Sequence, residues 1–484
     1  MIASRQSLRR ESGRSMKQSN ETSPTRRIYP LDHADLSQEQ LAVVFAMTSR
    51  RPEAFDVIAA EVGVEKAAQF HERWVLNYGH ASVAEHAIIH MAVENISRLA
   101  CDTLEDNRLA SYTEKSSRYQ ILDRNAFFEP EGLVDGEYLA TYRNICQSLF
   151  DSYTVMVSKM MEALPGVLPQ IDGESDSAYK LKVRRLAVDS CRFVLPASTL
   201  TNVGVTMNAR SMEHAITKLL SSDLQEERTI GEELLEQGRM ITPTLIKYAD
   251  YNNYIHTSRD VQRDLGQQHF LTAPISPVND NVVATLHQYD PDAPKKLAAA
   301  ILYPQGRESY GSIEDKIATL DEHEIQNIVD RYFEGFGAHD VPGRELEVVD
   351  YVFELVMDYG AYREFKRHRM QTYIPQQLTT NLGYIVPDFI DEVGLRQEFD
   401  DNMQKAHEAE TKLADVPGNI AQYVVTHAHL RRILVKLNLR ECYHLFKLRT
   451  QESAHFTIRR VAFAALLVVQ EVHPGLFKHL QLRD

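Results

Sequence analysis

The 484-residue sequence contains little cysteine and no long apolar run. Its four cysteines form no Cys-x-x-Cys pair and are too few to crosslink a chain of this length, which excludes a disulfide scaffold and favours a reducing, cytoplasmic setting. None stands in a recognisable nucleophile motif. No uninterrupted apolar stretch reaches the ~18 residues that a membrane-spanning helix needs, so an integral membrane protein is excluded.

Basic charge is also in short supply. The chain has 68 acidic and 53 basic residues and a formal net charge of −15. Such a protein is poorly suited to sequence-independent binding of DNA or RNA. A small anion can still bind at a local cluster of arginines, so any such cluster is informative.

The first 28 residues differ from the rest, because they are rich in arginine and serine and nearly free of apolar residues. They lack the apolar core of a secretory signal. We interpret residues 1–28 as a disordered basic tail. A transit peptide, or a true start at Met16, are the alternatives.

The remainder of the chain looks like a tandem duplication. Weak motifs recur in the same order at offsets of about 230 to 260 residues, which indicates internal repetition. Among them are Tyr78-Gly79-His80 with Phe336-Gly337-Ala-His339, Leu164-Pro165-Gly166 with Val416-Pro417-Gly418, and Asn208-Ala-Arg210 with Asn438-Leu-Arg440. We predict two diverged copies, residues 29–270 and 271–484, joined by a linker at Leu271 to Asp280.

The long segments of each copy have the spacing of helices. Helical periodicity is present in Ile89, Val93, Ile96 and Ala100, again in Leu346, Val349, Phe353 and Val356, and in the apolar run Phe456 to Gln470. Ser116 to Leu122 and Leu382 to Val386 are typical of short strands. The predicted fold is therefore α+β, helix-rich, with a small mixed or antiparallel sheet in each copy.

Two cationic segments are candidates for anion binding. Arg363, Lys366, Arg367, His368 and Arg369 stand at a predicted helix end, where the helix dipole favours cations by ~0.3–1 kcal/mol each. That effect accounts for one or two cations, so the run predicts a bound anion. The second segment, Ser111 to Tyr119, offers hydroxyls and an arginine that suit a phosphate, or else it is a solvated loop.

Two further patterns have competing explanations. Arg440 and His444 share a predicted helix face, as ligand-binding residues or as a surface salt-bridge face. His86, His90 and Glu94 have the i, i+4, i+8 spacing of a zinc site on a helix. Position 87 is alanine, so the glutamate of the His-Glu-x-x-His motif is missing. We therefore expect packed histidines and no metal.

In combination these motifs resemble those of the flavin-dependent thymidylate synthases, the ThyX family. The first copy carries His80-Ala-Ser82-Val-Ala-Glu85-His86, Arg108 through Tyr119, Arg192 through Pro196, Thr201 and Asn208-Ala-Arg210; the second carries Arg367-His368-Arg369, Asn438-Leu-Arg440, His444, Leu448-Arg449, Ala454 and Ile458-Arg459. Both copies depart from the family pattern. The first has Asp106, Asn107 and Leu219 at family Arg or His positions, and the second has Gln377, Thr379 and Gln422 in place of the phosphate-binding residues.

The losses are nearly complementary, so we expect one composite site shared by the copies. The resemblance implies reductive methylation of dUMP to dTMP with methylenetetrahydrofolate, FAD and NADPH. It implies Ser116, Ser117, Arg118, Arg192, Arg367 and Arg449 as substrate-binding residues, with Ser116 and Arg449 catalytic. It implies His80, Ser82, Glu85, Arg367, His368, Arg369, Asn438, Arg440 and His444 as FAD-binding residues.

The resemblance also implies a homodimer that reproduces the family's tetramer. Three other hypotheses stay open at this point. The protein is a non-catalytic nucleotide- or flavin-binding homologue, because both copies depart from the motif. It is a related transferase for another nucleotide or one-carbon donor. Or it is a metal hydrolase built on His86 and His90.

Overall fold

The computed structural model describes residues 27–29, 31, 36–49, 51–77, 81–118, 120–133, 136–270 and 283–483. Most of the predicted N-terminal tail and the whole predicted linker lie outside these residues. Among the described residues, no helix combines the length and the apolar character needed to cross a membrane.

The first copy is organised around an antiparallel sheet with strand order β1-β3-β2. Its elements are α1 Gln38–Thr48, α2 Phe55–Glu61, α3 Val64–Phe70, η1 His71–Asn77, η2 Ala81–His86, β1 Ile88–Ser97, α4 Arg98–Leu104, β2 Ala110–Glu114, α5 Glu137–Val167, α6 Asp176–Cys191, η3 Arg192–Val194, β3 Leu200–Asn208, α7 Ala209–Leu220, α8 Gln225–Ile241 and α9 Asn253–Phe270.

The second copy repeats this plan around an antiparallel sheet of order β4-β5-β7-β6. Its elements are β4 Ala284–Tyr289, α10 Ala293–Leu302, η4 Tyr303–Gln305, α11 Tyr310–Ile317, α12 Glu322–Tyr332, η5 Arg344–Val348, β5 Asp350–Asp358, α13 Tyr359–Phe365, β6 Thr372–Pro375, α14 Asp388–Glu392, α15 Arg396–Leu413, η6 Ile420–Val424, β7 Leu430–Asn438, α16 Leu439–Arg449, α17 Phe456–Val472 and α18 Pro474–Phe477. The α+β class is confirmed, as is the helix predicted from Phe456.

Equivalent caps show how the two copies correspond. Ser97 ends β1 and caps α4, as Asp358 ends β5 and caps α13. Asn208 and Asn438 cap α7 and α16 in the same way, each accepting a hydrogen bond from a backbone N–H three residues on. These four caps define which residues of the two copies occupy equivalent positions.

The helices predicted over Ile89–Ala100 and Leu346–Val356 are wrong for most of their length, because β1 and β5 occupy those segments. In β1, Ile89, Met91 and Val93 face inward by strand alternation. A β-bulge follows, with Asn95 at a φ of 59°, and returns Ile96 to the buried face. An alternating strand interrupted by one bulge therefore reproduced the spacing of a helix.

The two strands predicted over Ser116–Leu122 and Leu382–Val386 are also wrong. The sheet strands lie just before these segments, as β2 and β6. Past Glu114 the chain keeps one sheet-like hydrogen bond, from Lys115 N to Asn202 O, and then leaves the sheet as a loop. In the second copy only Tyr384 of the predicted segment forms an isolated bridge, to His429.

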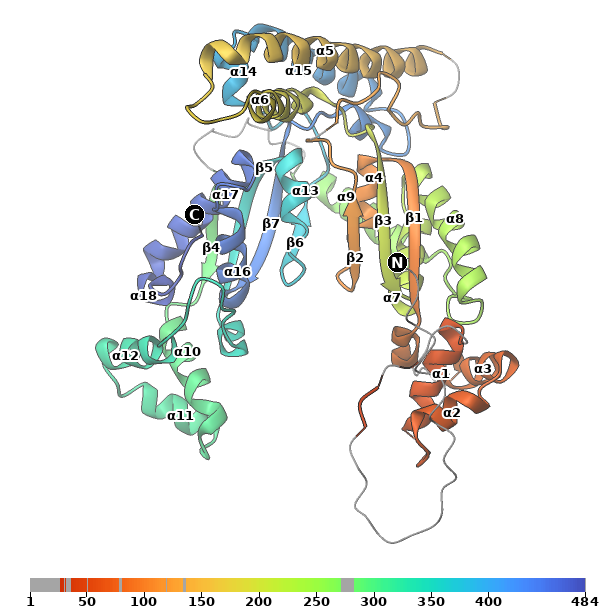
Figure 1. Ribbon diagram of the computed structural model, residues 1–484, viewed down its shortest axis with the longest axis vertical. Coiled ribbons are helices and arrows are strands. Elements are labelled where there is room, and N and C mark those ends of the chain that lie inside the picture. The colour runs from red at the N-terminus through yellow and green to blue at the C-terminus, as the bar shows by residue number, and fades with distance from the viewer. Residues whose placement is uncertain are drawn as a thin grey trace.

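The copies share two of their apolar clusters. In Figure 1 the two sheets stand side by side beneath a helical layer of α5, α6, α14 and α15. Helix α5 of the first copy packs against α15 of the second, and both contribute to one apolar cluster. The largest cluster likewise joins Leu139 to Leu149 of α5 with the second sheet.

A local two-fold axis relates the two copies at the point where they meet. Pro196 and Thr426, which are equivalent residues, form an antiparallel bridge. Ala197 N donates to Val425 O at 2.8 Å, and His427 N donates to Leu195 O at 2.9 Å. Helices α4 and α13 lie on either side of this point, between the two sheets (Figure 1).

Candidate functional site

A cavity of about 280 Å³ opens where the two copies meet. It is lined by Arg98, Glu114, Lys115, Ser116, Ser117, Arg118 and Arg192 of the first copy and by Gly360, Arg363, Glu364, Arg367, His427 and Arg449 of the second. Seven of these side chains are cationic and two are carboxylates. In a chain of net negative charge, this cluster gives the cavity a local excess of positive charge.

Glu114 is the carboxylate that holds the cationic side chains together. Arg98 of the first copy pairs with it at 2.9 Å, and Arg363 and Arg367 of the second copy also pair with it. Thr201 donates a further hydrogen bond to it at 2.9 Å. Burial acts to raise the pKa of Glu114, but the three guanidiniums outweigh burial and lower that pKa to about 2.

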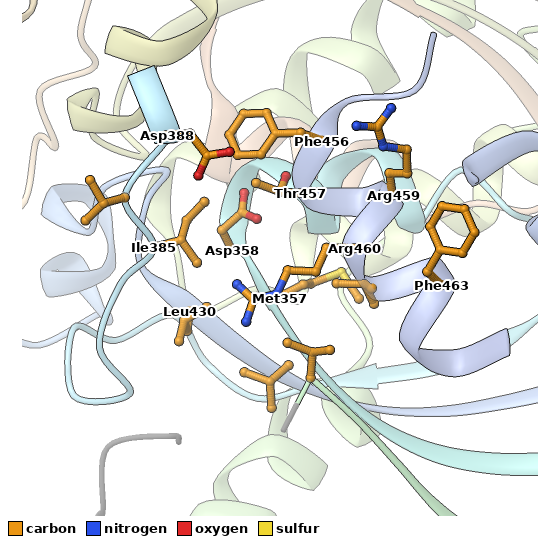
Figure 2. Close-up of a pocket in the computed structure, with 14 residues that line it drawn as sticks. Met357, Asp358, Ile385, Asp388, Leu430, Phe456, Thr457, Arg459, Arg460 and Phe463 are labelled. Carbon is orange, nitrogen blue, oxygen red and sulfur yellow. The ribbon is translucent and has the colours of Figure 1, made fainter. Parts of the chain in front are cut away.

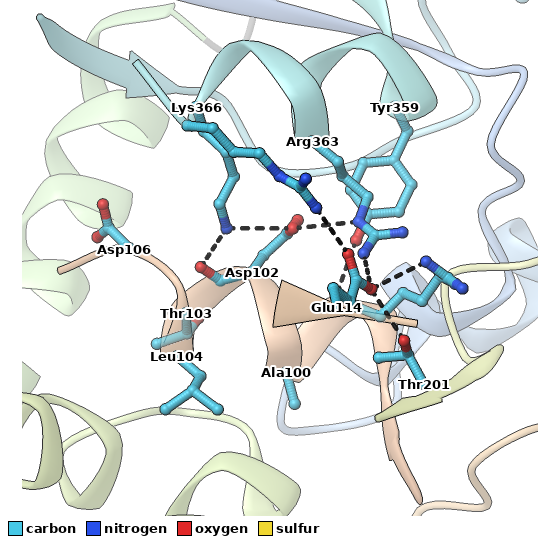
Figure 3. Close-up of polar contacts among 12 residues, drawn as sticks. Ala100, Asp102, Thr103, Leu104, Asp106, Glu114, Thr201, Tyr359, Arg363 and Lys366 are labelled. Carbon is cyan, nitrogen blue, oxygen red and sulfur yellow. Dashed lines mark hydrogen bonds and ion pairs between the residues drawn. The ribbon is translucent and has the colours of Figure 1, made fainter. Parts of the chain in front are cut away.

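Asp102, which lies on α4, is a second acidic partner of the cationic run. Figure 3 shows Lys366 and Arg363 reaching from α13 and its C-terminal end toward Asp102 and Glu114. Lys366 Nζ lies 3.3 Å from Asp102 Oδ1 and also donates to the backbone oxygen of Asp102. Carboxylates of the first copy therefore neutralise some of the cationic charge of the second, while Arg367 remains half-exposed.

The first copy supplies a loop of hydroxyls and arginines. Arg118 N donates to Ser116 Oγ at 3.2 Å, and Arg192 Nη1 donates to Ser117 Oγ at 3.1 Å. Asp189 pairs with both Arg118 and Arg192 and holds their guanidiniums in place. Burial opposes ionisation of Asp189, yet Arg192 and its other cationic neighbours keep its pKa below the ordinary value.

The second copy fixes Arg449 through a chain of hydrogen bonds. His368 Nδ1 lies 3.0 Å from Glu441 Oε1, and Arg449 Nε donates to His368 Nε2 at 2.9 Å. These partners select the tautomer with the proton on Nδ1. Burial and the Arg449 charge lower the pKa of His368, so the ring is neutral and orients Arg449 without repelling it.

The predicted FAD-binding residues fall into two separate groups. Ser82 and Glu85 lie in η2, which precedes β1, whereas Arg98 follows β1. The ten residues of β1 put about 30 Å between those ends. Glu85 pairs there with Arg210, and Ser82 is exposed. His80 lies outside the described residues.

The other FAD candidates follow the end of α13 or lie at the start of α16 and along it. His444 is exposed, with its ring centroid 5.5 Å from that of His368. Arg369 donates to the backbone oxygens of Arg108 and Ala110, and Asn438 caps α16. Arg440 pairs with Glu347 at 2.7 Å. Because Arg369, Asn438 and Arg440 already have protein partners, their roles toward FAD stay predictions.

Several residues of the cavity were not predicted from the motifs. Arg98, His427 and Glu364 belong to none of them, although all three line the cavity. Glu114 and Asp102 were also missed as counterions. The sequence did offer one signal for Glu114, because this residue lies inside the Ser111–Tyr119 segment. A carboxylate among residues that suit an anion must itself be neutralised by nearby cations.

The equivalent cavity of the opposite copy has inverted charge. This twin cavity, about 250 Å³ in volume, is lined by four carboxylates, Asp102, Asp106, Asp223 and Glu227, and by two arginines, Arg259 and Arg431. Asp106 occupies the position equivalent to Arg367, and Gln422 the position equivalent to Arg192. Leu219, equivalent to Arg449, is fully buried and contributes no charge.

A further cavity, about 300 Å³ in volume, lies beside α17 in the second copy. Figure 2 shows Asp358, Thr457, Arg459 and Arg460 around it, with apolar side chains such as Ile385 and Phe463. It is separate from the cationic cavity and contains none of the serines and arginines that line that cavity.

The zinc pattern fails on geometry. His86 ends η2 and His90 lies on strand β1, so the residues do not share a helix face. His86 stacks on Phe45 with ring centroids 4.7 Å apart, and His90 Nδ1 contacts Thr206 Oγ1 at 2.9 Å.

The fold and the cavity together define a duplicated α+β protein with one cationic site shared between its copies. A family model described as thymidylate synthase complementing protein matches residues 31–244 and again residues 285–475. The chain therefore belongs to that family and contains its domain twice.

Known proteins are similar to the whole chain or to half of it. A UPF0159 protein of Chlamydia muridarum is 30% identical over 443 residues, which cover 89% of this chain and 83% of that protein. A flavin-dependent thymidylate synthase of Clostridium tetani is 26% identical over 212 residues, 44% of this chain and 82% of that protein. The Helicobacter pylori enzyme ThyX, crystallised with FAD and dUMP, aligns at 16% identity with a TM-score of 0.33, covering 42% of this chain and all of that one.

Proposed function

We propose that this protein is a flavin-dependent thymidylate synthase that methylates dUMP reductively to dTMP at the composite cavity. The one-carbon donor would be methylenetetrahydrofolate and the reductant NADPH. The observation that supports this proposal is that one cavity contains Ser116, Ser117, Arg118 and Arg192 of the first copy beside Arg367 and Arg449 of the second.

The residues divide between the two ends of the nucleotide. The serines and the guanidiniums of Arg118 and Arg192 would bind the phosphate, since hydroxyls donate and arginine forms paired charged hydrogen bonds. Arg449 would face the uracil. Carbon 5 must become nucleophilic, so negative charge grows on the ring, and a preorganised cation stabilises that charge. The His368–Glu441 pair supplies this preorganisation.

The residues of one chain fit a flavin nucleotide only incompletely. Arg367 and His444 are accessible beside buried His368, while Ser82 and Glu85 lie at the far end of β1. We therefore propose that, in a homodimer, Ser82 and Glu85 of one chain lie beside Arg367, His368 and His444 of the other chain. FAD bound there would carry the hydride that completes the methyl group.

A second candidate function is nucleotide binding without catalysis. Glu364 lines the cavity and pairs with Arg449 at 3.4 Å, and a backbone oxygen of Glu364 also accepts from Arg449. The cation proposed for the uracil is thus already engaged. In this alternative the cavity binds the phosphate of a nucleotide but does not activate its base.

Purified protein distinguishes the two functions. The enzyme predicts a yellow protein with close to one FAD per chain, which oxidises NADPH and forms dTMP only when dUMP and methylenetetrahydrofolate are present. Protein that binds dUMP, but neither retains nor takes up FAD and forms no dTMP, would establish the binding function instead.

A further inference from the structure

His427 is a buried histidine in the wall of the cationic cavity. The residue is 2% exposed, and neither ring nitrogen has a hydrogen-bond partner of good geometry among the described residues. Buried polar groups are rarely left unpaired, because each costs about 1–3 kcal/mol of stability. The imidazole therefore lacks, among the described residues, the partner that a buried polar group needs.

The backbone, and not the ring, anchors this residue. His427 N donates to Leu195 O at 2.9 Å, and His427 O accepts from Gly360 N at 3.2 Å. The ring packs on Tyr359, with centroids 5.5 Å apart. Its position is thus fixed by strand-like bonds and packing, and neither ring nitrogen forms a hydrogen bond of good geometry in the part of the chain that the structure describes.

The surroundings of the ring favour an anion. Arg98, Arg192 and Arg363 line the same cavity, are all buried, and each keeps at least one side-chain nitrogen without a hydrogen bond. Burial, and then the charges of Arg98, Arg363 and Arg192, lower the pKa of His427 well below 6.5, although a nearby backbone group of Arg192 acts to raise that pKa; the ring is therefore neutral at pH 7. A neutral imidazole offers one N–H donor without adding a further positive charge.

We propose that His427 is a phosphate-contacting residue, which donates a hydrogen bond to an oxygen of a phosphomonoester held by Arg192 and the Ser116–Arg118 loop. Arg192 connects the loop to the segment that contains His427. Its Nη1 donates to Ser117 Oγ, and the η3 turn that begins at Arg192 pairs with that segment through the hydrogen bond from Ala428 N to Phe193 O. The phosphate contact itself does not depend on the proposed function. Only the identity of the nucleotide that carries the phosphate rests on that function.

The asymmetry of the duplication agrees with this role. Position 427 is equivalent to Ala197 in the first copy, because the two residues lie equally far before the helix-capping residues Asn438 and Asn208. His427 lines the cavity that contains the arginine cluster, whereas the lining of the acidic twin cavity contains no histidine.

Inorganic phosphate is the probe, with binding measured by calorimetry on the full chain. His427→Leu should weaken phosphate binding about ten- to hundredfold, the effect of losing one hydrogen bond to a charged group. His427→Gln, which keeps an N–H donor, should stay within a few-fold of the wild type. The matched control is His429→Gln: His429 is equally buried, but it contacts Thr426 Oγ1 at 2.8 Å and does not line the cavity.

Two further measurements separate ligand binding from a structural role. Phosphate should move the imidazole ¹⁵N resonances of His427, assigned by their loss in His427→Leu. Without phosphate, His427→Leu should melt at or above the wild-type temperature, because it removes two unpaired polar atoms. A lower melting temperature, or phosphate affinity equal to that of the wild type, would show a structural or water-bound histidine and overturn the proposal.

The experiments can refute the phosphate contact of His427 and the proposed function independently of each other. If phosphate binding depends on His427 while dUMP is never methylated, the contact stands and the enzyme does not. If dTMP forms and His427→Leu binds both phosphate and dUMP normally, the enzyme stands and the contact does not.

Discussion

The substitution Glu114→Gln removes the charge that joins the two copies at the cavity. Glu114 is buried and pairs with Arg98, Arg363 and Arg367, which lowers its pKa from 4.5 to about 2. That shift corresponds to about 3 kcal/mol of stability at pH 7. Breaking a buried ion pair by removing one partner costs ~3–5 kcal/mol in other proteins, so the two estimates agree.

The sign of the pH dependence gives a second check. Because the folded pKa is depressed, this stabilisation is present above pH 4.5 and is lost as pH falls toward 2. Urea unfolding should show Glu114→Gln less stable than the wild type by about 3 kcal/mol at pH 7, and by about 2 kcal/mol at pH 3.5.

Glu105 provides the matched control. It is also buried, but its carboxylate oxygens accept no hydrogen bond among the described residues, and burial raises its pKa. Glu105→Gln should therefore leave stability unchanged or improve it. A loss below about 1 kcal/mol for Glu114→Gln, or equal losses for both variants, would refute the role given to Glu114.

Three further outcomes are expected. Arg118→Ala and Arg449→Ala, one from each copy, should each abolish dTMP formation, and Arg118→Ala should weaken dUMP binding about ten- to hundredfold; full activity of either variant in a turnover assay would contradict a composite site. Arg367→Leu should lose activity while Asp106→Asn at the equivalent position keeps it, because only one cavity is used; the reverse result would assign the site to the twin. Burial raises the pKa of Glu226 to about 7 against the hydrogen bonds from Ser97 and Tyr423, so its stabilisation is present below pH 4.5 and is lost as pH rises through 7. The difference in unfolding free energy between wild type and Glu226→Gln should fall by about 3 kcal/mol over that range, and a pH-independent difference would contradict this.

The features of the site that could be predicted from the sequence are those encoded in short contiguous motifs. Ser116, Ser117 and Arg118 are neighbours in the chain, as are Arg367, His368 and Arg369, so their residue types alone indicated an anion. The duplication was also visible, because order and offset are properties of the sequence. The family model, which matches twice, confirms it.

The features that could not be predicted depend on contacts between distant residues. Glu114 and Arg363 are far apart in the chain, and they meet only because the copies pair about a local two-fold axis. The bulge at Asn95 was hidden for a related reason, since a positive φ at a non-glycine residue leaves no periodic signal. His427 belongs to no motif, and its importance follows only from its burial and its missing partner.

The charge inversion between the two cavities follows from the way the copies recognise each other. In a symmetric assembly equivalent positions carry the same residue, so a contact across the axis would pair arginine with arginine. Here Asp102 and Arg363 occupy equivalent positions, and Arg363 Nε lies 3.7 Å from Asp102 Oδ1. Lys366 also pairs with Asp102. Unlike copies thus gain an attraction that identical copies lack. Asp102, which provides this attraction, lines the twin cavity and adds to its negative charge, whereas Arg363 lines the other cavity and adds to its cluster of arginines.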